Sequence, residues 1–206
     1  MAIYGESEKL ILNENTRWSF LHIWEPVSIN GERPKYSITL VIKKDSPDMD
    51  IIRNTIKSVY KNSAAVLVDE SGTVPPLATL RLPIRDGDKD RPDDPSYANC
   101  YYINAYSVYA PGIVDQDLNE IKDKNQIYSG CFGRASISFY AFNTGEAAGI
   151  ACSLNNLQKI RDGERYDKSS TTTSASDDFK NLPRVTSATT DFAPADTTVV
   201  GEELPF

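Results

Sequence analysis

The sequence predicts an all-β domain with one inserted helix, followed by an acidic segment that does not fold. Residues 16–24, 35–44, 98–110 and 131–143 are rich in β-branched and aromatic side chains, and turn-forming residues separate them. Only residues 47–68 carry apolar side chains at strong helical spacing. Residues 167–206 contain eight Thr and five Ser among scattered apolar side chains, too few to offset the entropy lost on ordering. We therefore predict a folded domain over residues 1–166 and a disordered acidic tail over 167–206.

The first two strand segments form a predicted hairpin with a long loop. Residues 16–24 (TRWSFLHIW) and 35–44 (KYSITLVIKK) are separated by Pro26, Asn30, Gly31 and Pro34, which favour turns. The helix follows. Ile52, Ile56 and Val59 recur at spacings of three and four, and Ser46 with Pro47 predicts an N-cap followed by a proline in the first turn.

The second half of the domain is predicted to be mostly strand. Residues 79–84 predict a short strand, residues 98–110 a stronger one, and residues 131–143 alternate clearly. Residues 149–154 predict a last strand across a turn at 143–148, and residues 155–161 a short helical turn. Five or six strands with one helix in this length favour a small β-barrel over a sandwich.

The charge balance bears on the class of ligand. The 206 residues carry 22 Lys and Arg against 29 Asp and Glu, a net charge of −7, which argues against proteins that bind nucleic acid by neutralising phosphates. However, residues 167–206 account for −4 of that charge, which leaves −3 on residues 1–166. A nearly balanced barrel can bind a nucleic acid strand by stacking, and its binding would then depend only weakly on salt.

Cysteine and histidine usage limits the chemistry. Three cysteines, Cys100, Cys131 and Cys152, are widely spaced, which indicates a reducing compartment rather than a disulfide framework. A single histidine, His22, argues against a histidine-based catalytic or zinc site, and we expect no cofactor and no metal. No secretion signal or long apolar segment is visible, so we expect a cytoplasmic protein without membrane contact.

Alternation along the strands separates candidate contact residues from the core. Phe132, Arg134 and Tyr140 share the side of residues 131–143 that also carries hydroxyl groups, which is unusual for a plain surface. Rings can stack on unpaired bases while Arg and Lys contact phosphates. The predicted phosphate contacts are Arg17, Lys35, Lys43, Arg81 and Arg134, and the predicted stacking residues are Trp18, Tyr102, Tyr106, Phe132 and Tyr140. The alternative is that these rings are ordinary core or cross-strand packing.

The acidic stretch of residues 85–94 (RDGDKDRPDD) raises the possibility of a metal site at Asp86, Asp88 and Asp90. A calcium loop starting at Asp86 would need glycine at its sixth position and glutamate at its twelfth, where this chain has Arg91 and Tyr97. A solvated, mobile loop is the favoured interpretation.

The chain ends in Glu202, Glu203, Leu204, Pro205 and Phe206. This ending resembles the C-terminal tip of bacterial single-stranded-DNA-binding proteins, although that tip usually has a longer acidic run and Ile where this chain has Leu204. The resemblance implies that Phe206 anchors partner proteins, Pro205 limits the freedom of the tip, and the two glutamates steer it to a basic rim.

A second resemblance runs from about Arg17 to Arg165. The segments 35–37 (KYS), 43–45 (KKD), 82–88 (LPIRDGD), 101–105 (YYINA), 127–131 (IYSGC), 154–159 (LNNLQK) and 162–164 (DGE) are similar to the DUF2815 family of bacteriophage and prophage single-stranded-DNA-binding proteins. The resemblance implies an OB-type five-stranded β-barrel and a role in phage DNA replication or recombination.

Together these observations predict a non-enzymatic phage protein that coats single-stranded DNA during replication, recombination or repair in the cytoplasm of the bacterial host, and that recruits replication or recombination proteins through its C-terminal tip. A metal-dependent nuclease using Asp86, Asp88 and Asp90, and a phage structural protein whose rings pack at interfaces, are the alternatives. The sequence leaves open whether duplex DNA or RNA is also bound and whether the chain forms a homo-oligomer.

Overall fold

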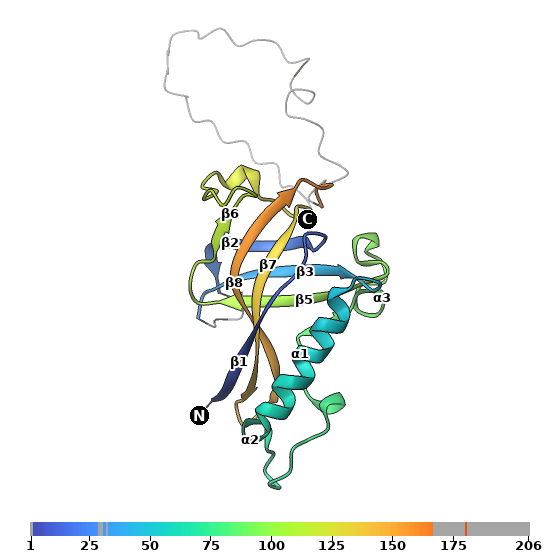
Figure 1. Ribbon diagram of the computed structural model, residues 1–206, viewed down its shortest axis with the longest axis vertical. Coiled ribbons are helices and arrows are strands. Elements are labelled where there is room, and N and C mark those ends of the chain that lie inside the picture. The colour runs from blue at the N-terminus through green and yellow to red at the C-terminus, as the bar shows by residue number, and fades with distance from the viewer. Residues whose placement is uncertain (1, 29–30, 32, 167–179, 181–206) are drawn as a thin grey trace, which may run out of the picture. The chain divides into compact units, whose positions relative to one another are not determined.

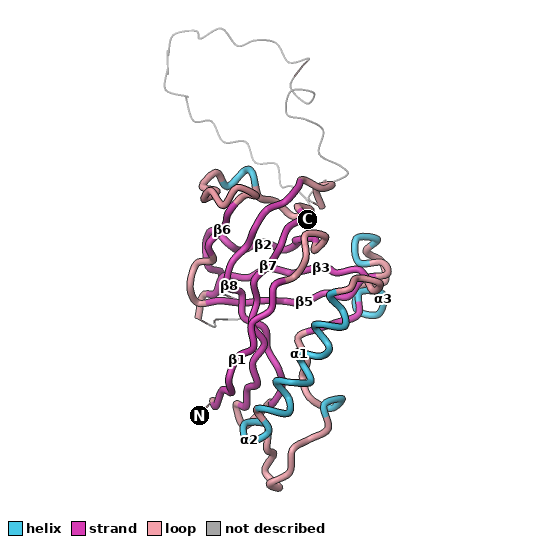
Figure 2. The backbone as a smooth tube through the Cα atoms, in the orientation of Figure 1, coloured by secondary structure: helices cyan, strands magenta, loops and turns pink. Residues whose placement is uncertain are grey.

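The computed structural model describes residues 2–28, 31, 33–166 and 180. The chain divides into two units, residues 1–168 and 169–206, and the description below concerns the first. Its strands are β1 (Ile3–Ile11), β2 (Arg17–Val27), β3 (Lys35–Lys43), β4 (Ile84–Asp86), β5 (Cys100–Ser107), β6 (Gly112–Val114), β7 (Phe132–Asn143) and β8 (Ala148–Arg161). Helices α1 (Asp48–Asn62), α2 (Ala64–Leu67) and α3 (Gly87–Asp90) and three short 3-10 helices complete it (Figures 1 and 2).

Five of the strands pair in a closed ring. β2 pairs with β3 and β3 with β5, both antiparallel. β5 then runs parallel to β8 at Tyr106 and Ser153, β8 pairs antiparallel with β7, and β7 returns to β2 where Phe132 faces Arg17. This ring is an OB-type barrel, so the predicted fold class is confirmed.

The inside of the ring is filled by alternate residues of its strands. Ile137 and Phe139 of β7 are fully buried beside Ile38 and Leu40 of β3, as the alternation predicts. Trp18 of β2 is also fully buried. Its ring lies directly against Gly133 of β7, where a Cβ atom would meet it, so the close approach requires glycine.

Three strands extend beyond the ring as a ribbon. β1 pairs along β7, and β7 and β8 stay paired as far as Asn143 and Ala148, while α1 and α2 lie against β1 and β7 (Figure 1). Ile52, Ile56 and Val59 point from α1 into the core, which confirms the predicted helical face. The predicted helix is interrupted at Ser63, and Pro47 rather than Ser46 holds the N-cap position. The Ser46 hydroxyl still accepts a hydrogen bond from the Asp48 N–H.

Several other elements differ from the expectation. Strands β1 and β6 were not predicted, and residues 155–161 continue β8 instead of forming a helical turn. The short strand predicted at 79–84 is replaced by a 3-10 helix, Leu77–Thr79, and by β4, which begins only at Ile84. Pairing with neighbouring strands supplies the hydrogen bonds that make these weakly patterned segments strands: β1 and residues 155–161 pair with β7, β6 with β8, and β4 with β5.

Candidate functional site

The outer face of β2, β3 and β5 carries three rows of residues. Directly paired residues of neighbouring strands point to the same side of a sheet. Along the rows lie Arg17, Val41, Tyr102 and Arg85, then Ser19, Thr39 and Asn104, then His22, Ser37 and Tyr106. In OB-type barrels the outer face of the second and third ring strands, here β3 and β5, is the surface that binds oligonucleotides.

Arg91, from the segment between α3 and the 3-10 helix Pro95–Tyr97, lies among three rings on this face. Its guanidinium carbon is 4.7 Å from the ring centre of Phe20, 4.5 Å from that of Tyr97 and 5.4 Å from that of Tyr102. Tyr97 and Tyr102 meet edge to face, with ring centres 5.4 Å apart. These four residues, with Tyr106, are called the aromatic face below.

Phe20 is the most accessible ring of the Arg91 cluster, with 51% of its surface exposed, against 1% for Tyr97 and 4% for Tyr102. Its φ angle is +46°, a left-handed conformation that is rare for a bulky residue. The pairing of β2 with β3 shifts between Ser19 and His22, so a bulge carries Phe20 out of the regular alternation. Strained residues of this kind are concentrated at functional sites.

Two predicted stacking residues are not available to a base. Trp18 is fully buried inside the ring, so the prediction that it stacks is wrong. Strict alternation along residues 16–24 would place Trp18 and Phe20 on one side of the strand, but Trp18 points inward while the bulge exposes Phe20. Tyr102 lies on the predicted outer side, but it is buried under Arg91 and its hydroxyl donates to Asp90 at 3.0 Å. Its assignment as a stacking residue is also wrong.

Arg17 and Phe132 belong to a stack of four side chains. The guanidinium of Arg161 lies 3.8 Å from the ring centre of Phe132, Arg17 lies 5.6 Å from the same ring, and Arg17 lies 3.9 Å from the ring centre of Tyr166. The structure thus brings two predicted residues together. Arg161 and Tyr166 were not predicted, because they lie in a misassigned segment and at the end of the domain.

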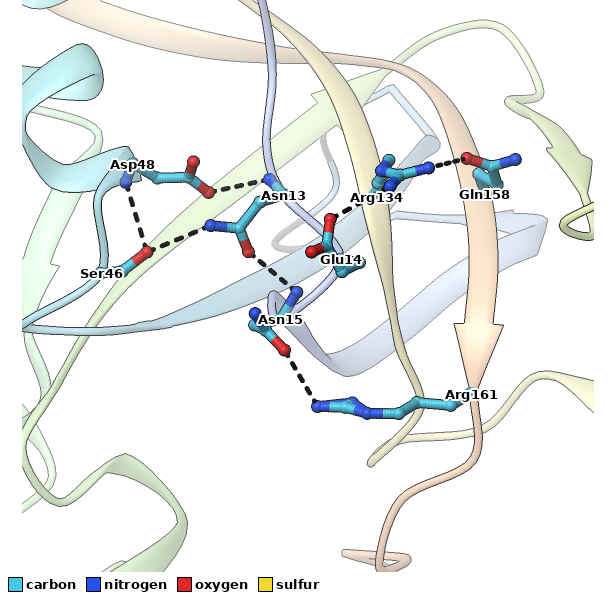
Figure 3. A network of polar contacts seen from close by, with 8 residues as sticks. All are labelled: Asn13, Glu14, Asn15, Ser46, Asp48, Arg134, Gln158 and Arg161. Carbon is cyan, nitrogen blue, oxygen red and sulfur yellow. Dashed lines mark hydrogen bonds and ion pairs between the residues drawn. The ribbon is translucent and has the colours of Figure 1, made fainter.

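Beside this stack, the loop between β1 and β2 is held by a polar network (Figure 3). The Asn13 backbone N–H donates to Asp48 at 2.8 Å, and the Asn15 backbone N–H donates to the side chain of Asn13 at 2.8 Å. Arg161 in turn donates to Asn15 at 3.3 Å. Predicted contact residue Lys43 is exposed and lines, with Phe132 and Arg161, a pocket of about 510 Å³ in this region.

The remaining predicted residues are spread over the surface. Arg134 lies on β7, where it pairs with Glu14 at 3.1 Å and Gln158 at 3.2 Å (Figure 3). Tyr140, further along β7, packs edge to face on Tyr4, and burial raises its pKa. Lys35 is the first residue of β3, where it pairs with Val27 of β2.

Tyr106 of β5 is 42% exposed on the aromatic face, as a stacking residue must be. Arg81 is exposed, and its backbone bridges to Gly149 of β8, outside the three rows.

The acidic segment contains the end of β4 and the helix α3 and is tied by ion pairs to Lys44, directly after β3, so the expectation of a loop throughout is wrong. Lys44 Nζ lies 2.6 Å from Asp86 and 2.7 Å from Asp88. The hydrogen bond from Lys44 holds the pKa of Asp88 below its usual value, with a further contribution from the Asn99 N–H. Asp90 accepts from Tyr102 and pairs with Arg85 at 3.6 Å. Within the described residues, no three His, Cys, Asp or Glu side chains are grouped as metal ligands.

The residues predicted to bind partners, Glu202, Glu203, Leu204, Pro205 and Phe206, lie outside the described residues. Across the part of the chain that is described, no helix is long and apolar enough to span a membrane.

An OB-type barrel with exposed rings and guanidinium groups on its outer face is the architecture of proteins that bind single-stranded nucleic acid. Residues 8–192 match the family described as Enterobacter phage Enc34, ssDNA-binding protein, and the chain belongs to this family.

Individual relatives agree with this assignment. The chain is 30% identical over 165 residues to putative protein p50 of Acyrthosiphon pisum secondary endosymbiont phage 1, covering 77% of this chain and 86% of that protein. The structure of the single-stranded DNA-binding protein from bacteriophage Enc34 in complex with ssDNA superposes with a TM-score of 0.66 at 27% identity, over 77% of this chain and 89% of that one. The fold is shared with gp2.5, a single-stranded DNA-binding protein of bacteriophage T7, at a TM-score of 0.51 and 15% identity, over 90% and 100% of the two chains.

Proposed function

We propose that this chain binds single-stranded DNA on the aromatic face and coats unpaired DNA during phage replication, recombination or repair. The observation that carries the proposal is Phe20. A half-exposed phenylalanine in a strained backbone conformation, with Arg91 against its ring, occupies the outer face of the ring of strands in a family of phage ssDNA-binding proteins.

The chemistry of the face suits an unpaired strand. Each base has a π-face that can stack on a ring for about 1–3 kcal/mol, largely regardless of sequence. Phe20 and Tyr106 are exposed enough to do so, and Arg91 sits close enough to Phe20 to contact the adjoining phosphate. The candidate phosphate contacts, of which about three or four would meet the strand at once, are the predicted residues Arg17, Lys35, Lys43 and Arg81 together with Arg85, Arg91 and Arg161. Arg134 is left outside the proposed face, because it lies on β7 and is engaged by Glu14 and Gln158.

The C-terminal tip is proposed to recruit partner proteins. Phe206 with its free carboxylate would anchor in an apolar pocket of a replication or recombination protein, and Glu202 and Glu203 would meet a basic rim. Recovery of a purified replication protein by the full chain but not by the Phe206→Ala chain supports this role, and equal recovery refutes it. Three further points stay predictions: the division into a domain over residues 1–166 and a tail over 167–206, the relation to the DUF2815 family, and the location in the host cytoplasm.

Non-enzymatic binding is favoured over nuclease activity because the carboxylates of Asp86, Asp88 and Asp90 are each engaged by other side chains. Asp86 and Asp88 are paired with Lys44, and Asp90 is engaged by Tyr102 and Arg85. A two-metal nuclease instead needs carboxylates directed together at two ions. Incubation of a labelled strand with Mg²⁺ or Mn²⁺ tests this choice, and cleavage would contradict it.

Fluorescence anisotropy of a labelled 30-nucleotide oligo-dT tests the proposal. Because Trp18 is fully buried, quenching of its fluorescence would be an indirect signal, whereas anisotropy reports binding at any site. We expect saturable binding at low salt. No anisotropy change would overturn the proposal, and parallel titrations of duplex DNA and RNA define how selective the face is.

A further inference from the structure

A pocket of about 260 Å³ opens on the outer face of β2, beside Phe20. It is smaller than the roughly 300–1,000 Å³ of pockets that take drug-sized ligands, so its size suits one planar heterocycle. Ser19 and Tyr97 lie among its lining residues and are almost completely buried, whereas Phe20 is half exposed. The ring of Phe20 is therefore the accessible one of these three side chains, while Ser19 and Tyr97 are covered.

The walls of the pocket are suited to a flat aromatic guest. Phe20, Tyr97 and Tyr166 line it, and Arg91 lies against both Phe20 and Tyr97. A base inserted here has a ring to stack on, and the phosphate attached to it would lie near a guanidinium group.

The pocket also has polar groups that distinguish one base from another. Asp94, Ser96 and Ser129 line it with Ser19. One carboxylate oxygen of Asp94, Oδ1, accepts the Ser96 N–H at 3.0 Å, which fixes the side chain at the start of the 3-10 helix Pro95–Tyr97. An ionised carboxylate has about four acceptor sites, so it can accept further hydrogen bonds but donate none.

We propose that this pocket takes one base of the bound strand and prefers a base with an exocyclic amino group, such as cytosine, over thymine. The inference rests on the proposed binding of single-stranded DNA. Cytosine presents its N4 amino group as a donor, which a carboxylate accepts. Thymine presents O4 at the same position, and an acceptor facing the Asp94 carboxylate is repelled. The serine hydroxyls can donate or accept and therefore fit either base.

The Asp94→Asn variant tests the pocket, because we expect it to abolish or reverse the preference for cytosine over thymine. Asparagine keeps an oxygen to accept the Ser96 N–H and is an equally good N-cap, so the local fold is retained. It replaces the second oxygen with an amide donor, which matches thymine O4. The control is Asp93→Asn, which removes the same charge from the neighbouring exposed residue, one that does not line the pocket.

The measurement is the Kd of the full chain and both variants for labelled 30-nucleotide oligo-dC and oligo-dT at one salt concentration. We expect the wild-type chain to bind oligo-dC about three- to tenfold more tightly than oligo-dT. Asp93→Asn should keep this ratio of affinities, whereas Asp94→Asn should bring the ratio to one or reverse the preference. The ratio cancels any general gain in affinity from losing a negative charge.

Two outcomes overturn the inference and differ from each other. If the wild-type chain binds both oligonucleotides equally, or if Asp94→Asn keeps the wild-type ratio, the pocket does not select the base although the strand is bound. If the wild-type chain binds neither oligonucleotide at low salt, the proposed function itself fails.

Discussion

The ring of Tyr166 covers the guanidinium group of Arg17, with the ring centre 3.9 Å from the guanidinium carbon. The contact is held from both sides. Arg17 donates to the Glu164 carbonyl at 2.7 Å, and the Tyr166 N–H donates to the Ser129 carbonyl at 3.0 Å. Gly130 allows the close approach, because a Cβ atom there would meet the Glu164 carbonyl. These contacts fix residues 164–166, and Tyr166 among them lines the pocket beside Phe20. The acidic segment 167–206 follows directly in the sequence.

Replacing Tyr166 tests the energetic role of this contact. Tyr166→Ala removes one ring from the stack of Arg161, Phe132, Arg17 and Tyr166, and we expect the free energy of unfolding to fall by about 1–2 kcal/mol. Tyr166→Phe keeps the ring and serves as the control. Urea denaturation measures both, and an alanine variant as stable as the phenylalanine variant would show that the stack contributes nothing.

Removal of the acidic C-terminal residues is expected to strengthen DNA binding. Residues 167–206 carry a net charge of −4, and negative charge on the same chain competes with phosphates for the cations of the domain. Deleting residues 201–206 should leave the affinity for oligo-dT equal or higher, and deleting 167–206 should raise it more. The gain should be largest at low salt, where screening is weakest. Weaker binding by either truncated chain would mean that the tail takes part in binding.

Acidification should loosen the segment around Asp88. Its pKa is lowered in the folded state, chiefly by the hydrogen bond from Lys44, so the stabilisation is present above the usual aspartate pKa of about 3.9 and is lost as the pH falls through the lowered value. Thermal unfolding measured from pH 6 to pH 2 should show a fall in Tm, and this fall should be smaller in the Lys44→Met variant than in the wild type. If the variant loses stability on acidification as steeply as the wild type, the pH dependence does not come from the ion pair between Lys44 and Asp88.

The salt dependence of binding distinguishes stacking from phosphate neutralisation. For single strands, the slope of log K against log salt is about −0.7 for each neutralised phosphate. We expect a slope of about −2 to −3, equivalent to three or four phosphates, because the domain is close to electrical balance and stacking supplies much of the affinity. Oligo-dT titrations between low and moderate salt give the slope. A slope steeper than about −5 would mean that neutralisation of phosphates by Lys and Arg, rather than stacking, supplies most of the affinity.

The ring of strands was predictable because its inner faces alternate strongly, as in Ile137 and Phe139 of β7. Strand β1 was not, because Gly5, Glu6, Ser7 and Glu8 carry no strand pattern, and pairing with β7 alone makes this segment a strand. Residues 155–161 were misassigned for a similar reason, since their hydrogen bonds come from β7.

The candidate site was only partly predictable. The side of β5 that carries Tyr102 and Tyr106 follows from alternation, but the cover over Tyr102 comes from Arg91, which lies in a segment expected to be mobile. Trp18 lies in the regular pairing of β2 with β3 and points inward, whereas the bulge that follows Ser19 turns Phe20 outward, and no sequence pattern marks that bulge. The outward position of Phe20 depends on how β2 pairs with β3.

The most direct test of the aromatic face compares Phe20→Ala with an Arg134→Ala, Tyr140→Ala double variant in oligo-dT titrations at fixed salt. Both sets of side chains are on the outside of the barrel, but only Phe20 contacts Arg91. We predict that Phe20→Ala weakens binding about tenfold or more, in keeping with the loss of one stacked base, while the double variant stays within about threefold of wild type. Wild-type affinity in Phe20→Ala, together with a large loss in the double variant, would place the strand on β7 and contradict this account.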